Sequence, residues 1–170
     1  LAWELRETLR EDLWLVVMSA TLDAEPVAAL LDDAPIITSA GRSFPVELTY
    51  LPRPAPKDLP FETQAHSLIL QAVADTEGGV LVFLPGEAEI RRTAAALQNH
   101  LPKNCVLRPL FGNLPFTEQR LAIQSEVQKN LRKIVLATAI AETSLTIQDV
   151  RIVVDCGRAR RARYDPAKGL

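Results

Sequence analysis

Residues 133–147 read Lys-Ile-Val-Leu-Ala-Thr-Ala-Ile-Ala-Glu-Thr-Ser-Leu-Thr-Ile. The segment begins as a continuous apolar run, which is typical of a strand buried on both faces of a parallel sheet. It continues as a stretch rich in Thr and Ser, whose short hydroxyl side chains suit phosphate oxygens. Parallel α/β sheets bind their ligands at the carboxyl ends of the strands. The stretch therefore predicts an α/β fold with a ligand-binding edge that begins near residue 137.

The composition is that of a globular chain of 170 residues, 48% hydrophobic and 24% charged, with a mean hydropathy of +0.06. No apolar run has the length of a membrane span and no signal peptide opens the chain, so we expect a cytoplasmic protein without a membrane partner. It starts at Leu1 rather than Met, which indicates a piece of something longer. Cys105 and Cys156 lack the spacing of metal or redox motifs, which favours reduced core residues. Because the net charge is only −2, affinity for nucleic acid must come from local patches.

The first part of the chain alternates helix and strand patterns up to about residue 40. The predicted elements are a helix over 1–11, a buried strand over 13–18, a helix over 24–31 capped by Asp23, and a short strand at 36–37. Residues 40–45 then indicate a connector, and four prolines from Pro52 to Pro60 indicate a second irregular stretch. We therefore expect a domain boundary near residue 40.

Beyond that boundary the alternation is regular. The predicted strands cover residues 46–51, 80–84, 105–107, 134–136 and 150–154, and the predicted helices cover 61–76, 87–100 and 117 to about 128. Strands that alternate with helices of this length imply βαβ units. The second part is therefore predicted to be a five-stranded parallel sheet with helices on both faces.

Three other strand ends resemble the one after residue 137 because their loops contain Ser, Thr, Gly or Asn. They are residues 19–21 (Ser-Ala-Thr), 83–86 (Phe-Leu-Pro-Gly) and 112–113 (Gly-Asn). Helix capping or turn chemistry explains each of them taken alone. Because the strand ends of a parallel sheet share one edge, together they describe an edge of small neutral donors and backbone amides. Such an edge suits a sugar-phosphate backbone that is held without reading its bases.

Taken together, these motifs resemble the DEAH-box helicases of superfamily 2. Residues 19–21 are similar to motif III, 83–86 with Glu89 and Ile90 to motif IV, 109–112 with Gln119 and Arg120 to motif IVa, and 137–147 with 153–155 to motif V. The connector at 41–46 and the segment 157–169 are similar to the bacterial HrpB type in particular. The resemblance covers essentially the whole chain, with the motifs in order.

The resemblance implies a RecA-like sheet of the P-loop NTPase type. Residues 1–39 would be the carboxyl-terminal end of a first RecA-like domain, and residues 40–170 most of the second, the helicase C-terminal domain, truncated before the arginine-finger motif. It further implies that the complete enzyme uses ATP and Mg²⁺. The implied partners are single-stranded RNA or another nucleic acid, the missing first RecA-like domain, and C-terminal domains of the same chain.

The resemblance also implies roles for individual residues. The residues implied to couple ATP hydrolysis to strand movement are Ser19, Thr21 and Ser144. The residues implied to contact RNA are Gly112, Asn113, Thr138, Thr143 and Arg158. Arg158 belongs to a basic run that a solvated edge explains equally well. Contact with the nucleotide falls to Ile123, Gln148 and Asp149, with two departures: Ile123 stands where relatives stack an aromatic ring, and Gln148 where they carry an acid.

The sequence contains no Gly-x-x-x-x-Gly-Lys-Ser/Thr phosphate cradle and no Asp-Glu-x-His box. Residues 157–160 imitate an arginine-finger motif only superficially. Phosphoryl transfer needs the phosphate cradle, the Asp-Glu-x-His box and an arginine finger. We therefore expect this chain alone neither to hydrolyse ATP nor to unwind RNA. Two alternatives to a helicase fragment remain: a non-enzymatic single-stranded RNA-binding module, and a degenerate RecA-like fold used for protein assembly.

Overall fold

The structure, a computed structural model, describes residues 2–18, 23–39, 41, 44–53, 56, 58–128, 130–142 and 146–160. The chain divides into two compact units, Leu1–Tyr50 and Leu51–Leu170, which are described separately. Within the described ranges, no helix is both long enough and apolar enough to cross a membrane.

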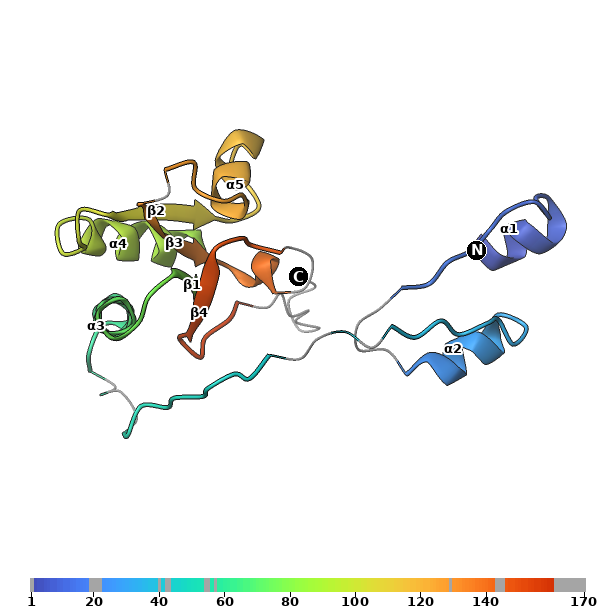
Figure 1. Cartoon of the computed structure of the whole chain (residues 1–170), viewed down its shortest axis with the longest axis horizontal. Coiled ribbons are helices and arrows are strands. Elements are labelled where there is room, and N and C mark those ends of the chain that lie inside the picture. Colours follow the sequence, from blue (N-terminus) through green and yellow to red (C-terminus); the bar gives the residue numbers. More distant parts are fainter. Residues whose placement is uncertain are drawn as a thin grey trace, which may run out of the picture. The chain divides into compact units, whose positions relative to one another are not determined.

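The described residues of the first unit form two short helices, α1 (Ala2–Thr8) and α2 (Ala24–Leu30), shown in Figure 1. Asp23 occupies the N-cap position of α2, as predicted, but its side chain makes no capping hydrogen bond. The strands predicted at 13–18 and 36–37 are absent from this unit, and Trp14 and Ile37 are 91% and 95% exposed. The prediction was wrong here because a strand needs a neighbouring strand for its backbone hydrogen bonds, and none pairs with these segments in the described structure.

The second unit is built on a four-stranded parallel sheet with the strand order β2-β3-β1-β4. The strands are β1 (Gly79–Phe83), β2 (Cys105–Leu110), β3 (Arg132–Ala137) and β4 (Val150–Asp155). The parallel α/β fold is as predicted, but the sheet has four strands in the described structure rather than five. Residues 46–51 form no strand, and Val46 and Tyr50 are exposed.

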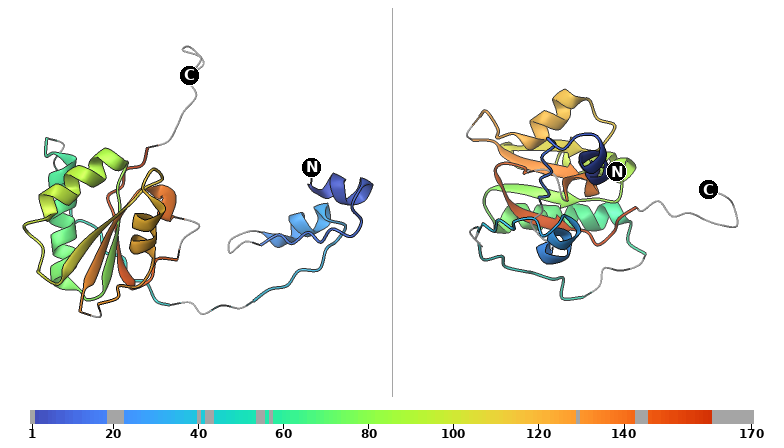
Figure 2. Two further views of the ribbon diagram at one scale, coloured as in Figure 1. Left: turned by 90° about the horizontal axis from the view of Figure 1, so that it is seen from above. Right: turned by 90° about the vertical axis from the view of Figure 1, so that its right-hand side faces the viewer.

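Helices cover both faces of this sheet, as Figure 2 shows. Helices α3 (Phe61–Asp75) and α4 (Glu87–Leu97) pack on one face, and α5 (Phe116–Ile123) packs on the other. Side chains alternate between the faces, so that Val80 and Val82 of β1 face α3 and α4 while Leu81 lies in the cluster on the α5 side. Both faces of the sheet are therefore buried, which explains the continuous apolar runs in the sequence.

Three helices are clearly shorter than predicted, and one of them is α1, which spans Ala2–Thr8 rather than 1–11. Helix α4 ends at Leu97 rather than 100, and residues 98–100 continue it as a turn in which His100 N donates to Leu97 O at 2.9 Å. Helix α5 ends at Ile123 rather than near 128, because the backbone at Gln124 turns extended and the Gln124 carbonyl accepts a 2.8 Å hydrogen bond from Lys133 Nζ. Tertiary hydrogen bonds replace the helical ones in that turn.

Candidate nucleic-acid interface

The register of the sheet aligns the carboxyl ends of all four strands. Ala137 of β3 lies opposite Leu110 of β2 and Phe83 of β1, and Phe83 lies opposite Asp155 of β4. Backbone hydrogen bonds continue this alignment one residue further, from Leu84 N to Ala137 O at 2.8 Å and from Thr138 N to Leu110 O at 3.2 Å. The loops that follow the strands therefore begin side by side along one edge, which we call the carboxyl edge.

The loop after β2 presents Gly112 and Asn113 to solvent. Phe111 and Leu114 on either side of them are buried in the core, and Leu114 N donates to Phe111 O at 3.1 Å. Gln119 of α5 donates from Nε2 to the Leu114 carbonyl at 2.8 Å, which holds the turn from inside. A Cβ at position 112 would meet nothing within 4 Å, so the tip has open space around it. The sequence 111–114 thus folds into an anchored loop with an exposed polar tip.

Thr138 follows β3 and starts the short 3-10 helix η1 (Ala139–Ala141). Its carbonyl accepts a 3.2 Å hydrogen bond from Ala141 N, but its hydroxyl does not cap the helix. The residue is half-buried, directly beyond the buried run of β3. Its backbone position is therefore fixed by two hydrogen bonds while the side chain is not used for capping.

The segment after β4 crosses towards the amino-terminal ends of α3 and α4. Gly157, at φ +67°, makes the turn, and its N–H donates to Asp155 Oδ1 at 2.8 Å. The guanidinium carbon of Arg158 then lies 5.0 Å from the centre of the Phe61 ring, a cation–π contact at the start of α3. Arg158 is exposed and at the carboxyl edge, but it packs on the domain rather than projecting freely.

A hollow of about 510 Å³ opens at this edge. Its lining comes from the ends of β1, β3 and β4 and includes Thr138, Arg158 and Arg160 together with the acids Glu142 and Asp155. Gly112 and Asn113 lie outside it. The structure thus brings Thr138 and Arg158 into one hollow and places the 112–113 loop further along the same edge.

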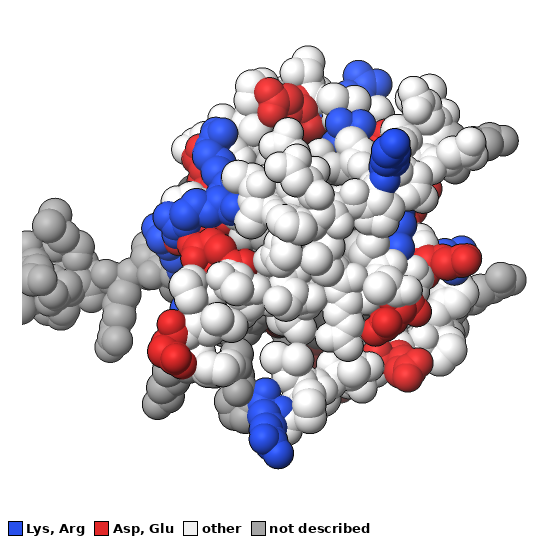
Figure 3. Space-filling model, turned by 90° about the vertical axis from the view of Figure 1, so that its left-hand side faces the viewer, with Lys and Arg blue, Asp and Glu red and all other residues white. Residues whose placement is uncertain are grey.

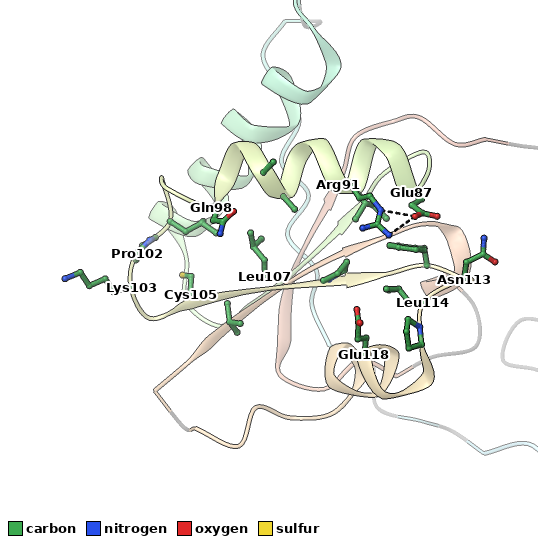
Figure 4. A pocket seen from close by; sticks show the side chains of 18 residues that line it. Glu87, Arg91, Gln98, Pro102, Lys103, Cys105, Leu107, Asn113, Leu114 and Glu118 are labelled. Carbon is green, nitrogen blue, oxygen red and sulfur yellow. Dashed lines mark hydrogen bonds and ion pairs between the residues drawn. The ribbon is translucent and has the colours of Figure 1, made fainter.

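A larger hollow of about 910 Å³ runs along β2 between α4 and the loop that precedes α5 (Figure 4). Of the predicted site residues it contains only Asn113, at one end, near the ion pair of Arg91 with Glu87 at 2.8 Å. Its walls are mostly apolar. We place the candidate site in the smaller hollow, because that is where polar side chains from three strand ends meet.

Ile123, Gln148 and Asp149 lie at the opposite edge of the sheet, which we call the amino edge. Asp149 directly precedes β4, and its carbonyl accepts a 2.8 Å hydrogen bond from Gly79 N at the start of β1. The three residues do come together: Gln148 N donates to Ile123 O at 3.0 Å, and Ser125 Oγ donates to Gln148 Oε1 at 2.8 Å and to Asp149 Oδ1 at 3.1 Å.

These contacts do not fit a nucleotide site. The side-chain oxygens of Gln148 and Asp149 already accept hydrogen bonds from residues 125 and 126, and Ile123 offers no aromatic face for a base. Within the described ranges, no three His, Cys, Asp or Glu side chains gather in a way that could hold a metal ion. In the described structure, the oxygens of Gln148 and Asp149 are therefore engaged within the chain.

The electrostatics of the unit are mixed rather than basic. On the face shown in Figure 3, acidic and basic side chains lie next to one another around an uncharged centre. The pKa of Glu62 is lowered by hydrogen bonds from the backbone and from Arg92, and the pKa of the Cys156 thiol is raised to about 11, mainly by burial. Neither sign of charge dominates that face (Figure 3).

Four predicted site residues, Ser19, Thr21, Thr143 and Ser144, lie outside the described residues. Conversely, the structure shows a contact that the sequence reasoning did not find: Arg160 of the basic run pairs with Glu89 at 2.9 Å beside the hollow. An acid in the first turn of a helix is explained by the helix dipole alone. The burial of Glu89 was therefore not visible in the sequence.

Residues 64–166 match the family model of the helicase conserved C-terminal domain. The ATP-dependent RNA helicase HrpB of Escherichia coli (strain K12) is 44% identical to this chain over 98% of its length. The chain belongs to the DEAH-box helicase family. A crystal structure of the Escherichia coli DEAH/RHA helicase HrpB superposes with a TM-score of 0.86 over 98% of the chain. The resemblance drawn from the motifs and the RecA-like fold are both confirmed.

The family also contains more distant relatives, such as the ATP-dependent RNA helicase HrpA of Escherichia coli (strain K12), 39% identical over 91% of this chain. In each case the chain spans a small part of the relative: 20% of HrpB and 12% of HrpA. The chain thus spans about a fifth of the length of HrpB.

Proposed function

We propose that this chain is part of an ATP-dependent RNA helicase and that the carboxyl edge of its sheet holds the backbone of a single RNA strand. The names of the relatives at 44% and 39% identity support the activity. In this proposal residues 1–39 end the first RecA-like domain and residues 40–170 form most of the second. The partners are then RNA and the remaining domains of the same protein.

One observation carries the RNA contact: the parallel register places Thr138, the 112–113 loop and Arg158 along one edge. A hydroxyl, exposed backbone around a glycine and a guanidinium are all donors to phosphate oxygens. None of them needs a particular base. The edge therefore suits sequence-independent binding of a sugar-phosphate backbone, as translocation along RNA requires.

The complete helicase would use ATP and Mg²⁺ bound largely by groups outside this chain. In the same proposal Thr143 contacts phosphate beside Thr138, and Ser19, Thr21 and Ser144 couple hydrolysis to movement of the strand. Ile123, Gln148 and Asp149 remain candidates for a nucleotide contact only if the hydrogen bonds at the amino edge rearrange in the complete protein.

The RNA contact is tested by anisotropy titrations of the complete protein with a fluorescein-labelled oligouridylate at several salt concentrations. Arg158→Ala should weaken binding and lower the salt slope by about one, because one phosphate contact is lost. Gln148→Ala at the amino edge is the matched control and should leave the slope unchanged. Equal slopes for wild type and Arg158→Ala would contradict the contact.

The helicase assignment is tested by RNA-stimulated ATP hydrolysis. We expect the complete protein to be stimulated, Thr138→Ala and Thr143→Ala to weaken the stimulation, and the 170-residue chain alone to show no turnover above a mock purification. ATP hydrolysis by the 170-residue chain alone would contradict the proposal that it is one part of a larger helicase. RNA binding by a complete protein that hydrolyses no ATP would favour the non-enzymatic RNA-binding module, and the absence of both activities would favour an assembly domain.

A further inference from the structure

Glu89 is a buried acid beside the candidate RNA hollow. It is the third residue of α4 and only 8% exposed, although carboxylates are seldom buried without partners. One of its oxygens, Oε1, accepts hydrogen bonds from Arg92 Nη2 at 3.0 Å and from Arg160 Nη2 at 2.9 Å. The other, Oε2, has no partner among the described residues. Burial of a charge in this way is costly, which calls for a role beyond helix stability.

The two arginines on Glu89 come from different places. Arg92 lies one turn further along α4 and also binds Glu62 of α3 at 2.5 Å, so it ties the two helices together. Arg160 belongs to the segment after β4, 71 residues away from Glu89 in sequence, and its side chain is 69% exposed. Glu89 is therefore a second point, beside Phe61, at which that segment is attached to the helical layer.

Gly86 makes room for this fastening. A Cβ at position 86 would lie 3.0 Å from Glu89 Oε2 and 3.4 Å from Cδ and Nε of Arg160. The backbone at Gly86 is extended, at φ −171°, so a larger residue is disfavoured by space rather than by conformation. The glycine of the strand-end turn thus lets the carboxylate and the guanidinium approach each other.

We propose that Glu89 is a positioning residue that holds Arg160 at the rim of the 510 Å³ hollow as a donor to an RNA phosphate. The inference rests on the proposed function of the carboxyl edge. Arg160 lines the hollow together with Thr138, and only one of its five N–H donors is engaged by Glu89. Glu89 fixes the orientation of the Arg160 guanidinium. The Arg158–Phe61 contact holds the same segment two residues earlier. The remaining donors are then available at a defined place, which lowers the entropy lost on binding.

The proposal is tested in the complete protein with Glu89→Gln and Arg160→Ala. Both variants should speed hydrogen exchange in residues 156–160 and raise the RNA concentration needed for half-maximal ATPase stimulation by about fivefold. The maximal rate at saturating RNA should be unchanged, which separates positioning from general damage. The double variant should be no worse than either single one, and Arg160→Lys should recover part of the affinity.

Glu87→Gln is the matched control, since Glu87 lies on the same turn of α4 but pairs with exposed Arg91. It should leave both readouts as in wild type. If Glu89→Gln fails to fold, exposed Arg160→Ala gives the same readouts alone. If wild type binds RNA, two results would overturn the role of Glu89 without affecting the proposed function. One is unchanged hydrogen exchange in the variants, and the other is faster exchange with an unchanged RNA dependence of the ATPase. A wild-type protein without affinity for RNA overturns the proposed function and this inference with it.

Discussion

The amino edge and the carboxyl edge of the sheet are built differently, although the same four strands run between them. At the amino edge, long charged side chains are engaged with backbone and with one another: Arg132 binds carbonyls at the end of α3, and Lys133 binds the Gln124 carbonyl. At the carboxyl edge, Asn113 is exposed and the Thr138 hydroxyl caps nothing. In the proposed function, the amino edge stabilises the fold and the carboxyl edge keeps some of its donors available for a ligand.

The largest effect should follow from Arg132→Ala at the amino edge. Its guanidinium donates to the carbonyls of Val73, at 2.7 Å, and Gly78, and to Thr76 Oγ1 at 3.2 Å. Removing it leaves the last turn of α3 without these donors, which should lower the free energy of unfolding by about 3 kcal/mol. Urea unfolding of the 170-residue chain, followed by circular dichroism, measures this change.

Exposed Arg120 of α5 provides the control for that experiment. Arg120→Ala should change the free energy of unfolding by less than about 0.5 kcal/mol. Equal losses for the two variants would show that the amino edge has no special weight in stability.

The two cysteines report on the two edges by their reactivity. Cys156, after β4, has its pKa raised to about 11 from 9.0 by burial and by Asp155, whereas for Cys105, at the start of β2, Arg132 opposes the rise caused by burial. Near pH 8 the thiolate fraction of Cys156 should be about 100-fold below that of an ordinary thiol. Iodoacetamide labelling followed by mass spectrometry, across a range of pH, should find Cys156 the slower of the two.

The raised pKa of Cys156 also makes the stability of the fold depend on pH. Because the folded pKa of Cys156 lies above the unfolded value, its contribution to stability is complete below pH 9 and is lost as the pH rises towards 11. Labelling of Cys156 at pH 8 as fast as in the urea-unfolded chain would contradict the burial on which this argument depends.

A smaller loss should follow from Glu126→Gln at the amino edge. Glu126 binds Arg108 through two hydrogen bonds of 2.8 and 3.0 Å, and both side chains are largely buried. Charge-assisted pairs of this geometry are the strong ones, so the variant should lose about 1.5 kcal/mol in urea unfolding. Glu87→Gln, which breaks an exposed pair, should lose less than about 0.5 kcal/mol. The RNA affinity of the complete protein should be unchanged in both variants. A loss of RNA affinity in Glu126→Gln would show that the amino edge also affects RNA binding.

Sequence patterns predicted the second unit well because its strands find their partners within the chain. Residues 80–84 and 134–136 read as buried strands and lie side by side in β1 and β3. The equally apolar residues 13–18 and the alternating residues 46–51 form no strand, since apolar pattern sets which residues favour burial but not which strand they pair with. Periodicity alone therefore predicts strands correctly only where a partner is present.

The candidate site was predictable to a similar extent. The polar strand ends at 112–113 and 138 were found because a parallel sheet must gather them at one edge. The hydrogen bonds that engage Gln148 and Asp149 were not found, because they depend on Ser125 lying against residues 23 and 24 positions away. Long-range side-chain contacts of this kind have no signature in a local pattern.

The smallest change in stability and the clearest change in function should come from Thr138→Val at the carboxyl edge. Valine keeps the shape of the half-buried side chain and removes only the hydroxyl, which makes no capping hydrogen bond, so unfolding should change by less than about 0.5 kcal/mol. If the hydroxyl donates to an RNA phosphate, affinity of the complete protein for an oligouridylate should fall about fivefold, and Thr138→Ser should restore it. A variant that binds RNA normally but unfolds as easily as Glu126→Gln would place Thr138 with the stabilising residues. The division of labour between the two edges would then fail at the residue where it is most sharply defined.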